Sequence, residues 1–208
     1  MSSESQFGPR KHKSLWHGER GAQMVEFAVA LPLLVLFVVG IFDFSGAFTL
    51  KQRLTNIARE SARVAARDAA NDLQGSASST GLPGSVVDAF QTVDNYLLGS
   101  NLSDCGVRFA GPAANLTWLF TSPSGGGCVS PGLTIIINRG YVFPMVGAAP
   151  PTVTCQSQPL GGQTAVIGTC VSVQYAYPWK FGHAASLLGA NTRLPQQISA
   201  IAVAVNQN

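Results

Sequence analysis

The stretch that most constrains this chain is residues 27–42, a run of apolar residues without a single charge. As a helix this run rises about 24 Å, somewhat less than the roughly 30 Å hydrocarbon core of a bilayer. Extension of the helix to Met24 and to Leu50 closes the difference, so the sequence predicts a helix that inserts into a membrane. The extension includes Glu26 and Asp43, which a simple anchor avoids because a carboxylate is costly in hydrocarbon.

The helical pattern continues beyond this apolar run. Apolar residues recur at the spacing of one helical face, namely Ala47, Leu50, Leu54, Ile57 and Val64. Arginines at 59, 63 and 67 recur every four residues on another face. We therefore predict one nearly continuous helix from about Met24 to about Leu73. Its first half would face lipid and its second half would be amphipathic.

The rest of the chain has the pattern of a short helix followed by strands. A Gly/Ser/Pro-rich linker spans residues 75–85, and Ser85 is the predicted N-cap of the next helix. After Gly99, apolar residues alternate with polar or small ones over residues 116–121, 133–137, 171–177 and 200–205. This pattern predicts an antiparallel sheet that packs one face on the amphipathic part of the long helix. The predicted fold class is α+β.

Composition argues against a catalytic domain. Only 11% of residues are charged, and from Cys105 to Asn208 there is no Asp or Glu, so this half holds no carboxylate pair for acid–base chemistry. The motifs of phosphate cradles and nucleophile elbows are absent from the sequence. His183 follows a glycine and precedes two alanines, a setting more typical of an exposed loop than of a catalytic site. We expect no enzyme activity, no cofactor, no metal and no small-molecule substrate.

The charge balance also argues against a nucleic-acid partner. The formal net charge is only +3. The basic residues do not form a stripe that interleaves with aromatic residues, which is the footprint of many nucleic-acid-binding surfaces.

The four cysteines predict disulfides. Cys105, Cys128, Cys155 and Cys170 all follow the apolar helix, and neither a CxxC pair nor a nearby histidine suggests zinc. If the helix carries the following chain out of the cytosol, pairing is the default. Four cysteines allow three connectivities. Short local loops favour Cys105–Cys128 and Cys155–Cys170, and the alternative is free buried thiols.

The N-terminal string from Arg20 to Phe27 has three interpretations. An ordinary secretory signal would be cut after Ala47, but the helical pattern runs through that position. A plain uncleaved anchor explains the apolar run and leaves the position of Glu26 unexplained. The third is a type IV pilin-like leader, in which a basic segment ends in Gly21, Ala22 follows the cut, and Glu26 is the fifth residue of the mature chain.

The third interpretation carries a specific resemblance. The sequence Glu19-Arg20-Gly21-Ala22, then Val25-Glu26-Phe27-Ala28, Leu31-Pro32-Leu33-Leu34 and Gly40-Ile41, resembles the TadE-like family. These proteins are minor pilins or pseudopilins of the tight-adherence (Flp-type) pilus system. The resemblance is closest over residues 18–70, and the family's C-terminal strand pair is similar to residues 171–177 and 198–205.

The resemblance implies a role and a topology. Residues 1–21 would be a cytoplasmic basic leader, 22–50 a transmembrane helix, 51–74 its amphipathic continuation, 75–85 a linker and 86–208 an extracytoplasmic domain, periplasmic or extracellular. The chain would lie in a bacterial inner membrane as a single-pass protein. Its partners would be a prepilin peptidase, other pilins and pilus-assembly components. Glu26 would set the register between subunits, and a headgroup-level Glu is the alternative for that residue.

Overall fold

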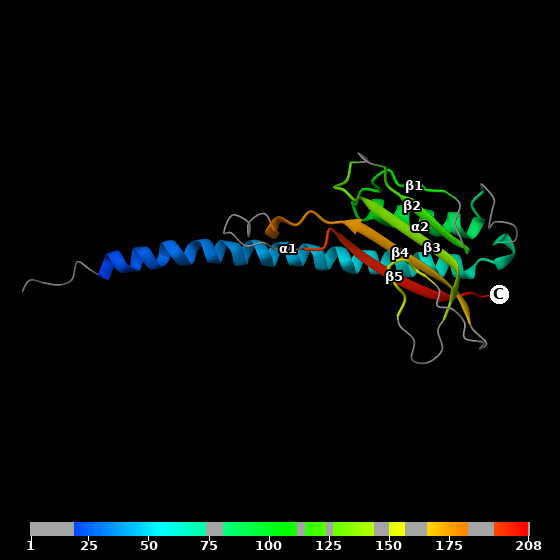
Figure 1. The fold of residues 1–208 in the computed structure, drawn as a ribbon, viewed down its shortest axis with the longest axis horizontal. Helices are drawn as coiled ribbons and strands as arrows, with labels where there is room; N and C mark the ends of the chain where they lie inside the picture. The colour runs from blue at the N-terminus through cyan, green and yellow to red at the C-terminus, as the bar shows by residue number, and fades with distance from the viewer. Residues whose placement is uncertain are drawn as a thin grey trace, which may run out of the picture.

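A long helix carries a layered α+β domain on its C-terminal half (Figure 1). The structure is a computed structural model that describes residues 19–73, 81–111, 115–123, 127–143, 150–156, 166–182 and 194–207. The N-terminal half of the helix projects away from the domain as a bare rod (Figure 1). The predicted α+β class, with a long helix packed on an antiparallel sheet, is confirmed.

The long helix, α1, spans Glu19–Arg67 and runs through Pro32 without interruption. It begins before the predicted Met24 and ends before the predicted Leu73. A separate short 3-10 helix, η1 (Ala70–Leu73), follows it. The early end has a physical reason, because Arg139 from the sheet donates hydrogen bonds to the carbonyl oxygens of Ala65 and Asp68. A side chain therefore satisfies the terminal carbonyls that a further helical turn would otherwise satisfy.

The second helix, α2, spans Gly84–Gly99, close to its predicted place. The predicted N-cap at Ser85 is wrong. Pro83 precedes the helix without a side-chain cap, and the Ser85 amide instead donates a 2.8 Å hydrogen bond to Oδ2 of Asp72. This bond ties the start of α2 to η1. On the apolar face of α2, Val86, Val93 and Leu97 are fully buried.

Within the described residues, the sheet has five strands in the order in which they occur along the chain. They are β1 (Arg108–Phe109), β2 (Thr117–Thr121), β3 (Leu133–Val142), β4 (Ile167–Ala176) and β5 (Gln197–Val205). Every neighbouring pair is antiparallel, so the sheet is a simple meander. The short edge strand β1 carries no alternating pattern and was not predicted. The four predicted strands are present.

Both helices cover one face of this sheet and enclose the main core (Figure 1). Leu54 and Ile57 of α1 meet Ile135 and Ile137 of β3 and Val171 of β4 in that core. Strand β5 turns its alanines towards the helix, with Ala200 buried and Ala202 and Ala204 packed at the core's edge. Small side chains on a strand allow a helix to approach closely. This explains why β5 lies close to α1, with only a thin layer of side chains between them.

The opposite face of the sheet has a smaller apolar cluster, built on Ile136, Tyr141 and the disulfide Cys155–Cys170. A second disulfide, Cys105–Cys128, lies beside the main core. Both pairings are those that the short loops favoured. The described chain has no free cysteine.

Candidate functional site: two carboxylates on the long helix

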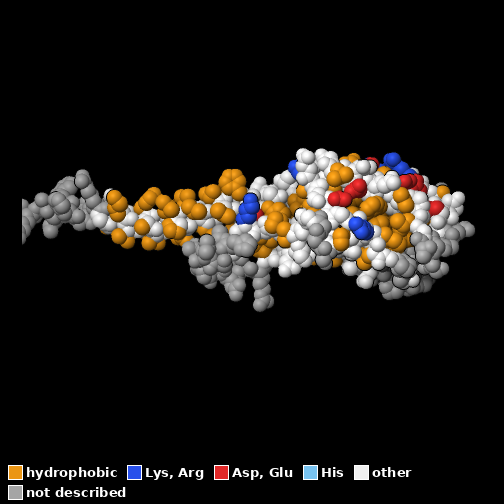
Figure 2. Space-filling model, turned by 90° about the horizontal axis from the view of Figure 1, so that it is seen from above, with side chains coloured by type: hydrophobic (Ala, Val, Ile, Leu, Met, Phe, Trp, Pro, Cys, Tyr) orange, Lys and Arg blue, Asp and Glu red, His pale blue; other side chains and the backbone are white. Residues whose placement is uncertain are grey.

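The described part of the domain does not cover the first turns of α1. Every residue from Gly21 to Val35 is exposed, including Phe27, Val29 and Leu34. Figure 2 shows this rod as a nearly continuous apolar surface that ends where the domain begins. By length and composition α1 is the one helix in the described chain that is suited to cross a membrane.

Glu26 lies near the start of this bare rod, and its side chain is exposed. Within the described residues, neither an ion pair nor a hydrogen bond reaches its carboxylate. The sequence places Gly21 and Ala22 about one helical turn before Glu26, and both lie inside α1. The Ala22 nitrogen is therefore roughly 6 Å from Glu26 along the helix axis. The roles predicted for these three residues stay predictions.

Asp43 is the second carboxylate of the apolar segment, and its surroundings are the opposite of those of the exposed Glu26. It is only 5% exposed. Its Oδ2 accepts a 2.8 Å hydrogen bond from the amide of Phe181, and its Oδ1 accepts one of 3.2 Å from the hydroxyl of Tyr177. The same hydroxyl lies 2.9 Å from the backbone carbonyl oxygen of Asp43. A carboxylate that is costly in an apolar setting is thus hydrogen-bonded by the chain itself.

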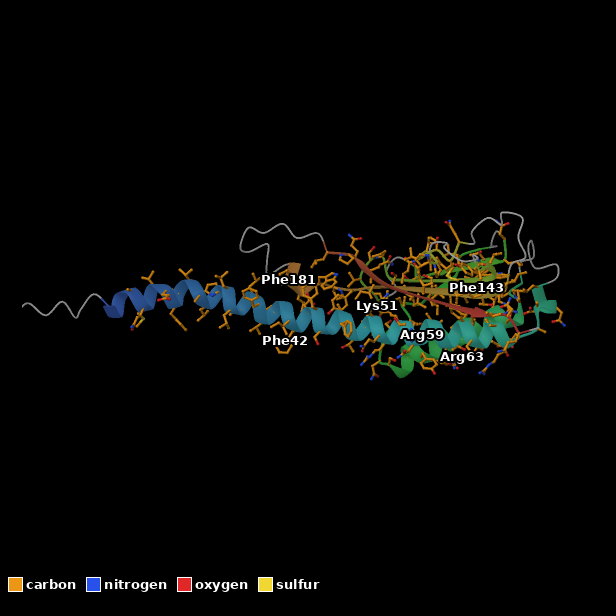
Figure 3. The ribbon with its side chains drawn as sticks, turned by 90° about the horizontal axis from the view of Figure 1, so that it is seen from below. Phe42, Lys51, Arg59, Arg63, Phe143 and Phe181 are labelled. Atoms are coloured by element: carbon orange, nitrogen blue, oxygen red, sulfur yellow. A yellow bond between two sulfur atoms is a disulfide. The ribbon has the colours of Figure 1, made fainter. Side chains whose placement is uncertain are left out.

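The partners of Asp43 come from the segment that follows β4, residues 177–182, which we call the strap. Figure 3 shows Phe181 lying on α1 ahead of the main body of the domain, while Phe42 points away from the strap. The strap reaches the helix because two glycines leave room. A Cβ at Gly46 would lie 2.6 Å from the Tyr177 hydroxyl oxygen, and one at Gly40 would lie 3.2 Å from the Phe181 ring.

Aromatic rings pack around this junction. Phe44 contacts the rings of Trp179 and Phe181 at centroid distances of 5.3 Å and 5.9 Å, and Tyr177 meets Trp179 edge-on at 4.8 Å. The Trp179 indole N–H donates to the carbonyl oxygen of Pro195. Such amphipathic rings are enriched at membrane–water interfaces. The strap therefore has the chemistry of a boundary between the apolar rod and the polar domain.

The far end of α1 is held by a buried cation. Arg139 of β3 is fully buried and donates to the carbonyl oxygen of Asp68 at 3.0 Å and to the hydroxyl of Thr169 at 3.2 Å. It also donates to the carbonyl oxygen of Ala65. Burial lowers the pKa of the Arg139 guanidinium, and the nearby charges of Asp72 and Asp68 oppose that effect. A positive charge at the C-terminal end of a helix also complements the helix dipole.

The structure places the aromatic residues of the strands and of the strap in different surroundings. Trp118 is buried in the core, whereas Tyr177 and Trp179 belong to the strap. His183 lies outside the described residues. The sequence did not predict the two partners of Asp43, Tyr177 and Phe181. Gly40 and Gly46, three residues on either side of Asp43, are a signal that a second segment approaches the helix.

The comparisons with known proteins concern the same part of the chain. Residues 21–63 match the family model described as TadE-like protein. The chain carries a TadE-like segment. This segment includes Gly21, Ala22 and Glu26, the Asp43 junction and the first turns of α1 that pack on the sheet, so the resemblance predicted over this stretch is confirmed. No significant match exists among curated proteins or solved structures.

The TadE-like segment and the bare apolar half of α1 support a membrane-anchored protein. The strands lie outside the matched residues. The described part of the chain also has no cluster of His, Cys, Asp and Glu that would hold a metal ion.

Proposed function

We propose that this chain is a minor pilin or pseudopilin of a tight-adherence pilus system, cut by a prepilin peptidase between Gly21 and Ala22. The observation that carries the proposal is the TadE-like match over residues 21–63, the segment in which Gly21 and Glu26 have the spacing of a pilin-like leader. The chain would be a substrate of the peptidase and a structural subunit, and not a catalyst.

The contrast between the two carboxylates supports an assembly role. The chain itself satisfies Asp43 through Tyr177 and Phe181. Glu26 is exposed on an apolar rod and receives no such bond from the described residues. A carboxylate in an apolar environment requires a partner. Cleavage would create a cationic amine at Ala22, and the amine of a neighbouring subunit would pair with Glu26 and set the register of the helices.

The bare half of α1 supports the same proposal. Its exposed apolar side chains need lipid around them in the membrane-anchored subunit and other helices around them in an assembled filament. The strap ends this apolar surface and connects it to the disulfide-bonded domain. In the proposed topology, residues before Gly21 lie in the cytoplasm and the domain lies outside the inner membrane, where its disulfides form.

The mature N-terminus tests the processing step. The full chain would be produced together with its prepilin peptidase, and intact mass would be measured. A chain that begins at Ala22 supports the proposal. A chain that keeps Met1 would show an uncleaved membrane-anchored protein, and a chain that begins at Phe48 would show a secreted one. Either of these two results overturns the pilin role.

Glu26→Gln tests the assembly step. This change keeps the shape of the side chain and removes its charge, so we expect normal insertion and a folded domain but loss of the subunit from pili. Glu60→Gln is the matched control, because Glu60 is a partly exposed residue of the same helix whose ion pair with Arg63 is a surface pair. Equal incorporation of both variants into pili would leave Glu26 without a role in register.

A further inference from the structure

Strand β5 forms one edge of the sheet, and the edge lies directly beside α1 (Figure 3). It pairs with β4 on one side, and no described strand pairs with its other side. It runs in the same direction as α1, because Ser199 lies near Lys51 and Gln207 lies near Ala66. A long open edge is a template for another strand unless it is covered or blocked.

The register shows which backbone groups of β5 point outward. Just beyond the two ends of the strand, the Asn206 amide donates to β4 and the Gln196 carbonyl accepts from Tyr177. Backbone groups alternate between the two sides of an antiparallel strand, so even-numbered residues face β4 and odd-numbered residues face outward. The contacts at the two ends agree, since the outward carbonyl of Ser199 accepts from Lys51 and the outward amide of Gln207 donates to Ala66 at 2.8 Å.

The described residues therefore bond both ends of the edge and form no hydrogen bond to the outward groups in its middle. Among the described residues, none bonds the outward backbone groups of Ile201, Val203 and Val205. A groove of about 320 Å³ lies along this part of the edge. Its lining includes Arg59, Arg63, Ala66, Val203, Val205 and Gln207.

The groove has a charged side. Arg59 and Arg63 lie on α1 beside the edge (Figure 3), and the Arg63 side chain is 64% exposed despite its 3.7 Å contact with Glu60. The two arginines are about 6 Å apart along the helix, and alternate residues of a strand are about 6.7 Å apart. A strand laid against β5 could thus place two side chains, at positions i and i+2, opposite these two arginines.

From this arrangement we propose that the edge of β5 binds an extended segment of a different protein chain, with acidic side chains at alternate positions facing α1. A second copy does not meet this requirement, because the described strands contain no Asp or Glu. Pairing of two β5 edges would also bring two arginine rows together. In the antiparallel direction it would reverse one α1 relative to the other, which two chains inserted the same way in one membrane do not permit. The proposal does not depend on the pilin role.

The test uses the full chain in nanodiscs of neutral lipid and a fluorescent nine-residue peptide in which Glu alternates with Val. We expect saturable binding in fluorescence anisotropy. A peptide with Gln in place of Glu should bind at least about threefold more weakly, as should the Arg59→Gln/Arg63→Gln variant with the Glu peptide. Arg108→Gln is the control, because Arg108 is an exposed arginine on the opposite edge strand, and it should leave binding unchanged.

Two further measurements separate strand pairing from charge attraction. Val203→Pro removes an outward amide without removing a bond to β4, a position at which an edge strand tolerates proline, and it should abolish binding. An N-methylated version of the Glu peptide tests the same bonds with the protein unchanged, and it should not bind. Binding of the methylated peptide equal to that of its parent, or unchanged binding in the Arg59→Gln/Arg63→Gln variant, overturns the proposal. Absence of any binding by the Glu peptide does so too.

Discussion

Oδ2 of Asp43 accepts a 2.8 Å hydrogen bond from the amide of Phe181, although the two residues are 138 positions apart in the sequence. The bond joins the apolar rod to the strap that leaves β4. With the hydrogen bonds of Arg139 at the other end of the contact, it is one of several polar contacts that hold the domain to α1. These polar contacts act together with the apolar core that α1 shares with the sheet, and the contribution of each can be tested.

Asp43→Ala should free the strap from the helix. A hydrogen bond to a charged group contributes about 1.5–3 kcal/mol, so the Phe181 amide should exchange with solvent about ten- to a hundredfold faster. Hydrogen exchange of the full chain in nanodiscs measures this. Asp88→Ala, which removes an exposed carboxylate on α2, should leave the rate unchanged. Equal rates in the parent chain and in Asp43→Ala would show that the bond does not hold the strap.

Gly46→Ala should displace the strap through a steric clash. The new Cβ would lie 2.6 Å from the Tyr177 hydroxyl oxygen, so either the ring or the helix must move. Cleavage by trypsin after the exposed Lys180 should become faster in this variant. Gly99→Ala is the control, since nothing lies within 4 Å of a Cβ at that position. Alanine also stabilises a helix by about 1 kcal/mol relative to glycine. If this effect outweighed the clash, cleavage after Lys180 would be slower in Gly46→Ala than in the parent chain, and that result would contradict the clash.

The regular elements were predictable because their patterns are local. The period of Leu50, Leu54 and Ile57 predicted the amphipathic half of α1, and the alternation around Ile135 and Val173 predicted the central strands. The predicted disulfides depended on short loops, which are also local. Strand β1 has only two residues, too few to show a period.

The polar contacts that fix the domain on the helix were not predictable. Asp43 was recognised as costly in a membrane, but its partners Tyr177 and Phe181 follow a different element and carry no sequence mark of the pairing. Arg139 continues the alternation of Leu133, Ile135 and Ile137, but an arginine is seldom fully buried, so its residue type argued against the core. Its burial follows from the place where α1 ends, which only the packed structure determines.

Arg139→Met should destabilise the domain. Methionine fills much of the same space but donates no hydrogen bond, so the carbonyl oxygens of Ala65 and Asp68 lose their partner away from water. We expect a loss of about 1–3 kcal/mol in the free energy of unfolding, measured by urea denaturation of the full chain in detergent. Arg108→Met, an exposed change on β1, should have little effect. Equal stability of Arg139→Met and the parent chain would show that the capping bonds are not needed.

Removal of either disulfide should lower stability by a similar amount. The bonds Cys105–Cys128 and Cys155–Cys170 span sequence separations of 23 and 15 residues. Loops of this size correspond to about 3 kcal/mol of chain entropy in the unfolded state, with the longer loop contributing slightly more. Double substitution by alanine is the suitable change, because Cys105, Cys155 and Cys170 are fully buried and a serine hydroxyl would need a partner there.

The two double variants should differ in where they loosen the fold. Cys105 packs in the main core with α1 and α2, whereas Cys155–Cys170 lies in the cluster on the opposite face of the sheet. Hydrogen exchange should therefore increase in α2 for the Cys105→Ala/Cys128→Ala variant and remain slow there for Cys155→Ala/Cys170→Ala. If both variants exposed α2 equally, the two apolar clusters would unfold as one unit. The opposite face would then be part of what keeps the domain on the helix.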